Sequence, residues 1–265
     1  MAEHKPELVE MKAQVYKDPR PKEHFDRFHE RTRTKGADWM YEVVRMVLTP
    51  ILFVIFRARC IASDNVPQEG PVIIAPNHFS FMDHFFVAVF VRRRVHFMAK
   101  SQLFTRPIQF IYTHGGVFPV RRGHDDQEAF ITAHTVLAKG GTIVMYCEGG
   151  RSRSGDLAPK PKRGIGKLAL ESGATIVPVA IYGSAKVRNW KRLQFPKVTV
   201  QYGEALRYEQ VPDPDKGQQQ EVANEIFGEI KRLYAGLEEH GRRGMAQKVR
   251  AARRAERRQG AATPA

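Results

Sequence analysis

Short apolar runs alternate with segments of helical character through the middle of the chain, and this alternation restricts the fold more than any other feature. The apolar runs cover residues 72–75, 95–98, 116–120, 142–146, 176–181 and 198–201. The helical segments cover residues 83–91, 126–139, 164–172 and 219–237. Strands that alternate with helices usually form βαβ units, in which the strands lie parallel. We therefore predict an α/β fold, a single domain with a largely parallel central sheet flanked by helices.

The size of the chain agrees with one main domain. Among its 265 residues, 42% are apolar, which is enough for one sizeable core with terminal extensions. We divide the chain into a polar arm with an apolar helix (1–65), a main domain (66–240) and a basic tail (241–265). Ligands of such sheets bind beyond the carboxyl ends of the strands, and the polar clusters of this sequence lie there.

The charge of the chain favours polyanionic partners. The formal net charge is +15, which suits anionic lipid head groups, nucleic acid or phosphorylated metabolites. The tail after Gly241 holds eight Lys or Arg residues and one acid, Glu256. It is either a solvated helix that ends in disorder or a segment that binds a membrane or nucleic acid. Cys60 and Cys147 are far apart, so we expect neither a disulfide framework nor a cysteine zinc site, as in a reducing cytoplasm.

The N-terminal region combines a polar arm with the most apolar stretch of the chain. Residues 1–35 lack the apolar core of a secretory signal. Phe25 and Phe28 allow an amphipathic turn or two, and a loosely ordered terminus is the alternative. Residues 39–56 are apolar but contain two charges and Pro50. Charges near the centre of a bilayer are costly, so we predict an interfacial or re-entrant helix in preference to a full span.

A histidine and an aspartate follow the first strong strand. The sequence N-H-F-S-F-M-D brings His78 and Asp83 just past the run 72–76. On a regular helix the two side chains would point about 140° apart, so a strand-to-helix turn is needed for them to pair. A paired carboxylate would hold one ring nitrogen protonated and leave the other to take a proton from an attacking alcohol. The alternative is a helix cap beside a packed ring.

Two further clusters carry arginine beside glycine. Arg121 and Arg122 follow the run 116–120 and suit bidentate capture of a phosphate, unless they belong to a solvated turn. After the run 142–146 comes C-E-G-G-R-S-R-S-G. Glycines let backbone N–H groups approach an anion, and neighbouring arginines add charge. We interpret this segment as a phosphate-binding turn, and its spacing differs from that of the nucleotide-binding P-loop.

These clusters together resemble a known family. The motifs, in chain order, are N-H-x4-D (Asn77, His78, Asp83), G-x-F-x-x-R (Gly116, Phe118, Arg121), E-G-x-R-S (Glu148, Gly149, Arg151, Ser152) and V-P-V-A from Val177. Over residues 66–201 the sequence resembles the glycerolipid acyltransferase family, which comprises lysophosphatidic acid and glycerol-3-phosphate acyltransferases. The resemblance implies that 66–240 is an acyltransferase catalytic domain. It also implies that His78 is the catalytic base, oriented by Asp83, and that the acceptor is bound by Arg121, Glu148, Gly149, Gly150 and Arg151.

The third motif departs from the commoner F-P-E-G-T-R of lysophosphatidic acid enzymes. Tyr146, Cys147 and Gly150 occupy its first, second and fifth places. The sequence E-G-G-R-S-R-S-G is more similar to the glycerol-3-phosphate branch, whereas the short chain and simple core are more similar to the lysophosphatidic acid branch. A thioester of Cys147 is a weaker reading than a buried inert thiol. We expect no metal, because His84 and His96 lack ligand spacing, and no serine hydrolase, because Ser80 lacks its elbow motif.

The sequence thus leads to direct acyl transfer onto an alcohol. The expected co-substrates are acyl-coenzyme A or an acyl carrier protein, with no cofactor, and a phosphorylated glycerolipid acceptor, lysophosphatidic acid first. Glycerol 3-phosphate, a glycolipid or an aminoacyl lipid are the alternatives within the same chemistry. A non-enzymatic polyanion-binding protein is the rival from another class. We expect a peripheral or monotopic protein on an anionic membrane surface, at its cytoplasmic face, and no nucleic acid partner.

Overall fold

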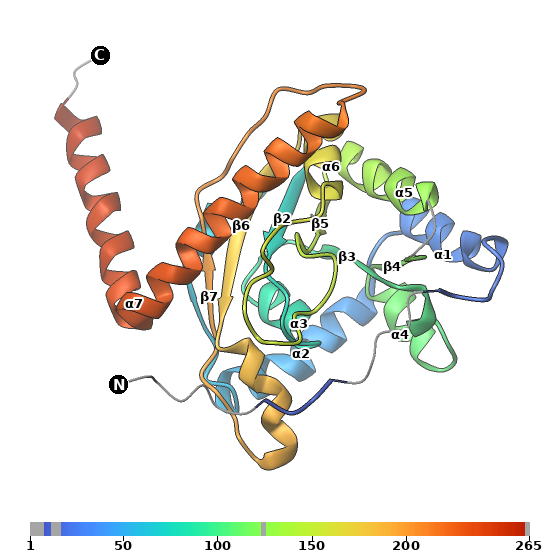
Figure 1. Cartoon of the computed structure of the whole chain (residues 1–265), viewed down its shortest axis with the longest axis horizontal. Coiled ribbons are helices and arrows are strands. Elements are labelled where there is room, and N and C mark those ends of the chain that lie inside the picture. Colours follow the sequence, from blue (N-terminus) through green and yellow to red (C-terminus); the bar gives the residue numbers. More distant parts are fainter. Residues whose placement is uncertain (1–7, 12–16, 123–125, 263–265) are drawn as a thin grey trace.

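A seven-stranded sheet forms the centre of the chain over the residues described by the computed structural model, 8–11, 17–122 and 126–262 (Figure 1). The strands are β1 (Arg59–Ile61), β2 (Val72–Pro76), β3 (Val95–Lys100), β4 (Val117–Val120), β5 (Thr142–Val144), β6 (Thr175–Tyr182) and β7 (Thr199–Tyr202). Their order is β1-β7-β6-β2-β5-β3-β4. All neighbours are parallel except β6 and β7, which are antiparallel. The predicted single α/β domain with a largely parallel sheet is confirmed.

Helices cover both faces of this sheet. They are α1 (Glu23–Thr34), α2 (Trp39–Val54), α3 (Asp83–Ala88), α4 (Ile108–His114), α5 (Gln127–Ala138), α6 (Gly164–Ser172) and α7 (Lys216–Ala262), with the 3₁₀ turns η1 (Ser63–Asn65), η2 (Ser101–Leu103) and η3 (Ser184–Arg192). Successive strand residues point to opposite faces. Ile74 therefore packs in the cluster under α2 and α3, and Ile73 in the cluster under α5, α6 and α7.

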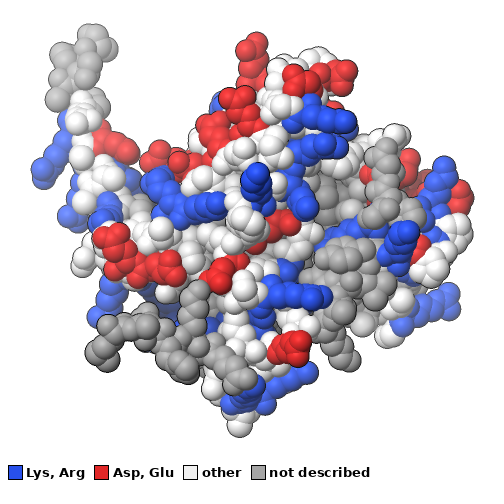
Figure 2. All heavy atoms as spheres, viewed as in Figure 1, with Lys and Arg blue, Asp and Glu red and all other residues white. Residues whose placement is uncertain are grey.

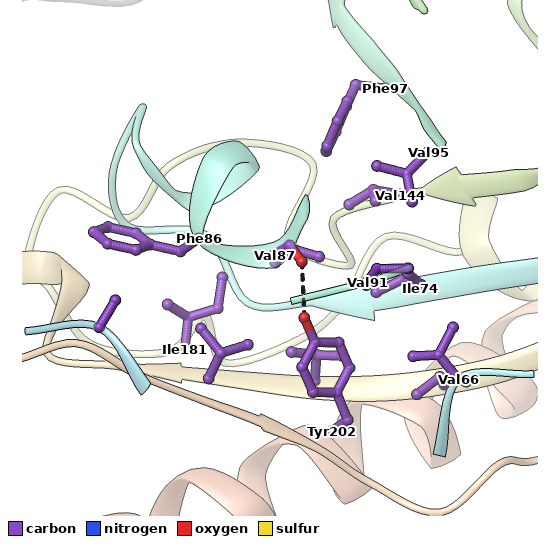
Figure 3. Close-up of a cluster of buried hydrophobic side chains, with 14 of the residues drawn as sticks. Val66, Ile74, Phe86, Val87, Val91, Val95, Phe97, Val144, Ile181 and Tyr202 are labelled. Carbon is purple, nitrogen blue, oxygen red and sulfur yellow. Dashed lines mark hydrogen bonds between the residues drawn. The ribbon is translucent and has the colours of Figure 1, made fainter. Parts of the chain in front are cut away.

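The first of these clusters supports the helix that carries Asp83. Phe86 and Val87 of α3 are fully buried against β2, β6 and β7 (Figure 3). The Tyr202 hydroxyl donates a hydrogen bond of 2.8 Å to the Val87 carbonyl oxygen. A buried hydroxyl needs such a partner, and this bond joins the end of α3 to the sheet. The position of α3 relative to the strands is thereby fixed.

The N-terminal arm is more ordered than a turn or two. Its described part contains α1, a helix of 12 residues. Phe25 and Phe28 are buried and pack with Phe104. His29 forms a hydrogen bond of 2.9 Å with Thr132 of α5. The alternative of a loosely ordered terminus is therefore wrong for residues 23–34, because apolar burial holds the helix against the domain.

The apolar stretch forms α2, as predicted, and lies along the domain. Asp38 caps the helix by accepting a hydrogen bond from the Met40 backbone. Tyr41 and Leu52 are buried, whereas the opposite face exposes large apolar side chains: Trp39, Val43, Met46, Val47, Ile51 and Val54. Among the described helices, none has the length and apolar character needed to cross a bilayer. The interfacial position of α2 stays a prediction.

The basic tail is helical, and the start of this helix packs on the domain while most of its later side chains are exposed. Helix α7 breaks at Gly241, where φ is 62° and ψ is 178°, and its second part turns away from the first and extends outward at one side of the sheet (Figure 1). The apolar side chains of this part, Met245, Ala246 and Val249, join the cluster of Ile61, Leu233 and Leu237. Arg253 donates hydrogen bonds of 2.6 and 2.9 Å to the Asp64 carboxylate. Strand β1, which we had assigned to the N-terminal part, belongs to the sheet that this helix borders.

Candidate active site

The turn between β2 and α3 brings His78 and Asp83 together. Strand β2 ends at Pro76, and the Asn77 amide then accepts a hydrogen bond of 2.7 Å from the Ile181 N–H. The Asp83 carboxylate oxygen Oδ2 accepts hydrogen bonds from His78 Nδ1 at 2.9 Å and from the N–H groups of Phe79 and Ser80. These backbone bonds fold the chain back from helix to strand end. The sequence predicted that such a turn was needed, and the structure contains it.

The environment of His78 favours a neutral imidazole. Burial lowers its pKa below the usual value, and Asp83 opposes this by raising it. The positive charges of Arg151 and Arg122 lower the pKa further. Because Nδ1 carries the proton shared with Asp83, the neutral ring has its lone pair on Nε2. A neutral imidazole held in this way can accept a proton from an alcohol at neutral pH.

Two residues that the sequence analysis did not assign to the site support the His78 ring. The Tyr146 ring stacks on it, with centroids 3.9 Å apart and an angle of 22° between the planes. The Tyr146 hydroxyl forms a hydrogen bond of 2.9 Å with His84 Nδ1. Burial raises the pKa of Tyr146 well above its usual value and lowers that of His84 well below it. The pair is therefore uncharged and fixes one face of the His78 ring.

Glu148 connects the third motif to the histidine turn. One carboxylate oxygen accepts the His78 N–H at 2.8 Å, and the other accepts the Ala158 N–H at 3.1 Å. Burial raises the pKa of Glu148 to about 7. The Ser152 N–H also donates to the His78 carbonyl oxygen at 2.9 Å. The resemblance implied a contact between Glu148 and the acceptor, whereas the structure gives both oxygens backbone partners inside the protein.

The two glycines and the cysteine of this motif shape the turn. Gly149 has a φ of +66°, and a Cβ there would lie 2.9 Å from the Lys162 side chain. A residue with a side chain would be strained in both respects. Gly150 follows in the same turn. Cys147 is buried, and burial raises the pKa of its thiol. The thiolate needed for a covalent acyl-enzyme is thus disfavoured, in agreement with the predicted inert thiol.

The two adjacent arginines, Arg121 and Arg122, lie in different surroundings. Arg121 donates a hydrogen bond of 3.1 Å to the Arg20 carbonyl oxygen, and its guanidinium lies 6.0 Å from the Phe25 ring. It therefore points to the N-terminal arm. Arg122 has the charge that acts on His78. The structure places Arg121 against the N-terminal arm and not beside the His78–Asp83 pair, and its contact with the acceptor stays a prediction.

Lys100 adds a third cation that the sequence analysis missed. Burial, together with the charges of Arg122 and Arg151, lowers its pKa to about 8. Lys100, Arg122 and Arg151 are thus close enough to repel one another. Such a group of cations suits an anion with more than one negative charge. Lys100 ends β3, so its proximity could have been inferred only from the strand order.

Two hollows lie near the His78–Asp83 pair. The larger, the site hollow, has a volume of about 820 Å³ and is lined in part by Ser80, Lys100 and Arg151, with Ile51 and Phe195 farther out. The smaller, the apolar cavity, has a volume of about 120 Å³ between α2, α3 and α4. Its walls are almost wholly apolar, and His84 is one of the few polar groups in them. The His78 ring lies next to His84, with centroids 5.2 Å apart.

The fold and the site together define an α/β protein with a buried histidine–aspartate pair at the carboxyl edge of a mainly parallel sheet. Residues 57–182 match the family model described as Acyltransferase. This part of the chain is therefore an acyltransferase-family domain. The suspected family is thus confirmed, and all the residues of the His78, Gly116 and Glu148 motifs fall within the matched range.

Known proteins similar to this chain have related names. The 1-acyl-sn-glycerol-3-phosphate acyltransferase of Borreliella burgdorferi is 34% identical over 126 residues, which cover 46% of this chain and 50% of the relative. The human 1-acyl-sn-glycerol-3-phosphate acyltransferase beta is 32% identical over 153 residues, with coverage of 54% and 53%. The chain thus matches about half the length of these curated relatives.

A solved structure supports the fold over a longer range. The 1-acyl-sn-glycerophosphate (LPA) acyltransferase PlsC from Thermotoga maritima superimposes with a TM-score of 0.52 at 20% identity. The match covers 79% of this chain and 88% of the other. Because fold is better preserved than function at this identity, the match concerns the arrangement of the sheet and helices.

Proposed function

We propose that this chain transfers an acyl group from a thioester to the hydroxyl of lysophosphatidic acid and so forms phosphatidic acid. His78 Nε2 takes the hydroxyl proton while the oxygen attacks the thioester carbonyl carbon. The tetrahedral intermediate then loses the sulfur, and the protonated imidazole returns the proton to the thiolate. The observation that carries the proposal is the 2.9 Å bond between His78 Nδ1 and Asp83, since it leaves Nε2 as the base.

The cations near this base favour a phosphorylated acceptor. Arg122, Arg151 and Lys100 bring three positive charges to the region of His78. A phosphate monoester carries up to two negative charges and accepts bidentate hydrogen bonds from guanidinium groups. A neutral glycolipid acceptor would bring no negative charge to complement these cations. A phosphate on the acceptor is therefore the better match to the site.

The two hollows favour lysophosphatidic acid over glycerol 3-phosphate. The apolar cavity beside His84 offers a place for the acyl chain in transfer. The site hollow has apolar walls from Ile51, Phe56 and Phe195 in addition to its cations. The acyl chain already present on a lysophospholipid would be buried against these walls. Glycerol 3-phosphate, which has no acyl chain, would leave these apolar walls exposed to water. The product has two chains, and two apolar compartments suit it.

A direct competition tests the acceptor. Both acceptors are supplied at equal concentration, and acyl-coenzyme A or acyl carrier protein is limiting, so that the product ratio reports the ratio of the kcat/KM values. We expect mainly phosphatidic acid made from the supplied one-chain lipid. His78→Gln serves as the control and should give neither product. Mainly lysophosphatidic acid among the products would assign the enzyme to the glycerol-3-phosphate branch.

Transfer to glycerol 3-phosphate is the second candidate function, and Arg153 is the residue that favours it. Its side chain is exposed two residues after Arg151 and could add a contact to a small acceptor. The Arg153 carbonyl oxygen already accepts a hydrogen bond of 2.8 Å from Arg188, so the backbone at this point is held. Arg153→Ala should leave the kcat/KM for lysophosphatidic acid within about twofold if our assignment is right. A selective loss for glycerol 3-phosphate would support the second candidate.

The location and donor belong to the same proposal. A lipid acceptor requires access to a membrane, and the exposed apolar face of α2 supports peripheral or monotopic attachment. Synthesis of acyl thioesters in the cytoplasm would put the site on the cytoplasmic face. Both donor carriers present the same thioester to His78, so each is tested as donor in the competition.

A further inference from the structure

The segment around η3 combines exposed apolar side chains with a strong positive charge. Residues 184–197 contain five Lys or Arg and no Asp or Glu. Trp190 is 55% exposed and Leu193 is 81% exposed, the largest exposed fraction among the large apolar side chains described. Lys186, Lys191 and Lys197 are exposed as well. Large apolar side chains at such exposure cost free energy in water unless something covers them.

The backbone holds Leu193 outward in an unfavourable conformation. Its φ is +56°, in the left-handed region that glycine or asparagine normally occupies. The Leu193 N–H bonds to the Trp190 carbonyl oxygen at 2.9 Å, which closes the turn. A glycine here would relieve the strain and remove the exposed side chain. Strain that is kept at a surface leucine indicates a function for that side chain.

The η3 turn is adjacent to the end of α2. The rings of Phe56 and Phe195 meet with centroids 6.0 Å apart, and Arg57 donates to the Phe195 carbonyl oxygen. The end of α2 exposes Val54 at 75% and Ile55 at 39%. Figure 1 shows η3 and this end of α2 together at the lower side of the molecule, and Figure 2 shows Lys or Arg side chains there. Two segments distant in sequence therefore form one surface, which we call the η3–α2 surface (residues 51–55 and 186–193).

This surface borders the site hollow. Trp190, Lys191 and Ile55 line the site hollow, and so do Ser80 and Arg151 from the region of the His78–Asp83 pair. A partner bound to the η3–α2 surface therefore lies beside the site hollow.

We propose that the η3–α2 surface docks on an anionic lipid bilayer, with Trp190 and Leu193 inserted at the level of the head groups and the lysines against the lipid phosphates. Tryptophan beside lysine and apolar side chains is typical of protein segments at membrane interfaces. A nucleic acid would pair the cations but leave Leu193, Val54 and Ile55 in water. The proposal rests on the proposed function in one respect, because it names the surface from which a lipid acceptor would enter the site hollow.

The first test uses the fluorescence of Trp190. The chain has two tryptophans, so Trp39→Phe leaves Trp190 as the reporter. We expect its emission to shift to shorter wavelength when phosphatidylcholine vesicles containing phosphatidylglycerol are added, and brominated acyl chains to quench it. Vesicles of phosphatidylcholine alone should give a much smaller shift. If the protein sediments with the anionic vesicles while Trp190 emission stays unchanged, the η3 turn is not inserted and the proposal is wrong.

The second test measures partitioning of matched variants. Leu193→Asp should weaken binding to the anionic vesicles by about tenfold or more, because it replaces an inserted apolar group by a charge. Ile131→Asp is the control, since Ile131 is 45% exposed on α5, away from this surface. Lys191→Glu should weaken binding by about fivefold or more, whereas Lys216→Glu at the start of α7 should have a small effect. Equal losses for the members of each pair would contradict a defined docking surface.

A third measurement separates this proposal from the acyltransferase activity. Leu193→Asp should keep wild-type acyl transfer between soluble short-chain substrates and lose most of its transfer to an acceptor held in vesicles. If wild-type protein makes no product from any substrate but Leu193→Asp still reduces vesicle binding, the docking surface stands and the proposed function fails. If Leu193→Asp binds vesicles normally, the docking surface fails whatever the activity.

Discussion

In the proposed mechanism, the proton transfer depends on His78 and on the few groups that touch it. Because general-base catalysis typically contributes about 10²- to 10⁴-fold, His78→Ala should lower kcat by that range with donor and acceptor saturating. Asp83→Ala should lower kcat less, since the imidazole remains. Circular dichroism and thermal melting check that both variants are folded. Near wild-type turnover in folded His78→Ala would exclude the mechanism.

The pH dependence tests the cations near His78. Activity needs the neutral imidazole, so kcat/KM should rise with pH through the pKa of His78, which burial and the two arginines lower below 6.5. Arg151→Gln removes one positive charge, so the protonated ring becomes less unfavourable and the rising limb should move to higher pH. Arg121→Gln is the control and should leave the limb in place, since Arg121 faces the N-terminal arm. A shift in the opposite direction would refute the electrostatic account.

Tyr146 allows its ring and its hydroxyl to be tested separately. Tyr146→Phe keeps the stack on His78 and loses the bond to His84, whereas Tyr146→Leu loses both. If stacking orients the base, we expect Tyr146→Phe to keep kcat within about fivefold and Tyr146→Leu to lose considerably more. The KM values of both substrates should change little, because Tyr146 positions His78 without binding substrate. Equal losses of kcat in the two variants would mean that the Tyr146 hydroxyl, and not the stacked ring, supports His78.

At the scale of elements, the loop of the third motif is fastened to the β2–α3 turn through Glu148. A glutamine at this position offers one acceptor oxygen and one N–H₂ group, so it cannot accept the N–H groups of both His78 and Ala158. We expect Glu148→Gln to lower the free energy of unfolding by about 1–3 kcal/mol and to reduce kcat as well. Urea unfolding and steady-state kinetics on the same preparation measure the two effects. Unchanged stability together with a raised acceptor KM would mean that Glu148 binds the acceptor.

The raised pKa of Glu148 adds a pH dependence to that stability. Its pKa of about 7 lies above the usual 4.5, so the folded state favours the protonated form. The stabilisation from this group is fully present below pH 4.5 and is lost as the pH rises through about 7. Wild-type minus Glu148→Gln unfolding free energies, measured from pH 5 to 8, should therefore decrease with rising pH. An increase would mean that the backbone bonds outweigh burial.

For the whole molecule, the docked tail is expected to stabilise the sheet edge. Deletion of residues 242–265 removes Met245, Ala246 and Val249 from their cluster. Burial of about two such side chains corresponds to roughly 1–3 kcal/mol of unfolding free energy. The pair of Arg253 and Asp64 is partly exposed and should contribute little by itself. Urea unfolding of the truncated chain measures the contribution of the cluster. Arg253→Met in the full chain measures the contribution of the pair, with Arg250→Met at an exposed position as its control. A truncated chain of unchanged stability would make the tail a surface-bound appendage.

Deletion of the tail also tests how the membrane is bound. The exposed cations of the tail were predicted to attract anionic lipids together with the apolar stretch 39–56. With the η3–α2 surface as the main site, vesicle binding by the truncated chain should keep most of its salt dependence. Sedimentation with anionic vesicles at several salt concentrations measures this. Loss of salt dependence on truncation would make the tail the main electrostatic anchor.

Local patterns in the sequence determined the class of fold, most strands and the His78–Asp83 pair. Strand and helix periodicity is a property of neighbouring residues, so runs such as 72–75 and 164–172 were assigned without tertiary information. Strand β1 was missed because its residues Arg-Cys-Ile form no apolar run, and its place in the sheet comes from pairing with β7. Helix α1 was underestimated, since its stability comes from the contacts of Phe25 and Phe28 with distant residues.

Tertiary structure decided which charged groups share the site. The order of strands brings Lys100 of β3 and Arg122 after β4 toward His78 after β2. The distances between these residues along the chain do not reveal that order. The same holds for Arg121, whose direction depends on the position of the arm. The sequence by itself determined the His78–Asp83 motif and the α/β class, because both depend on residues close along the chain. The partners of Glu148, the surroundings of Arg121 and the η3–α2 surface depend on chain segments that only folding brings together.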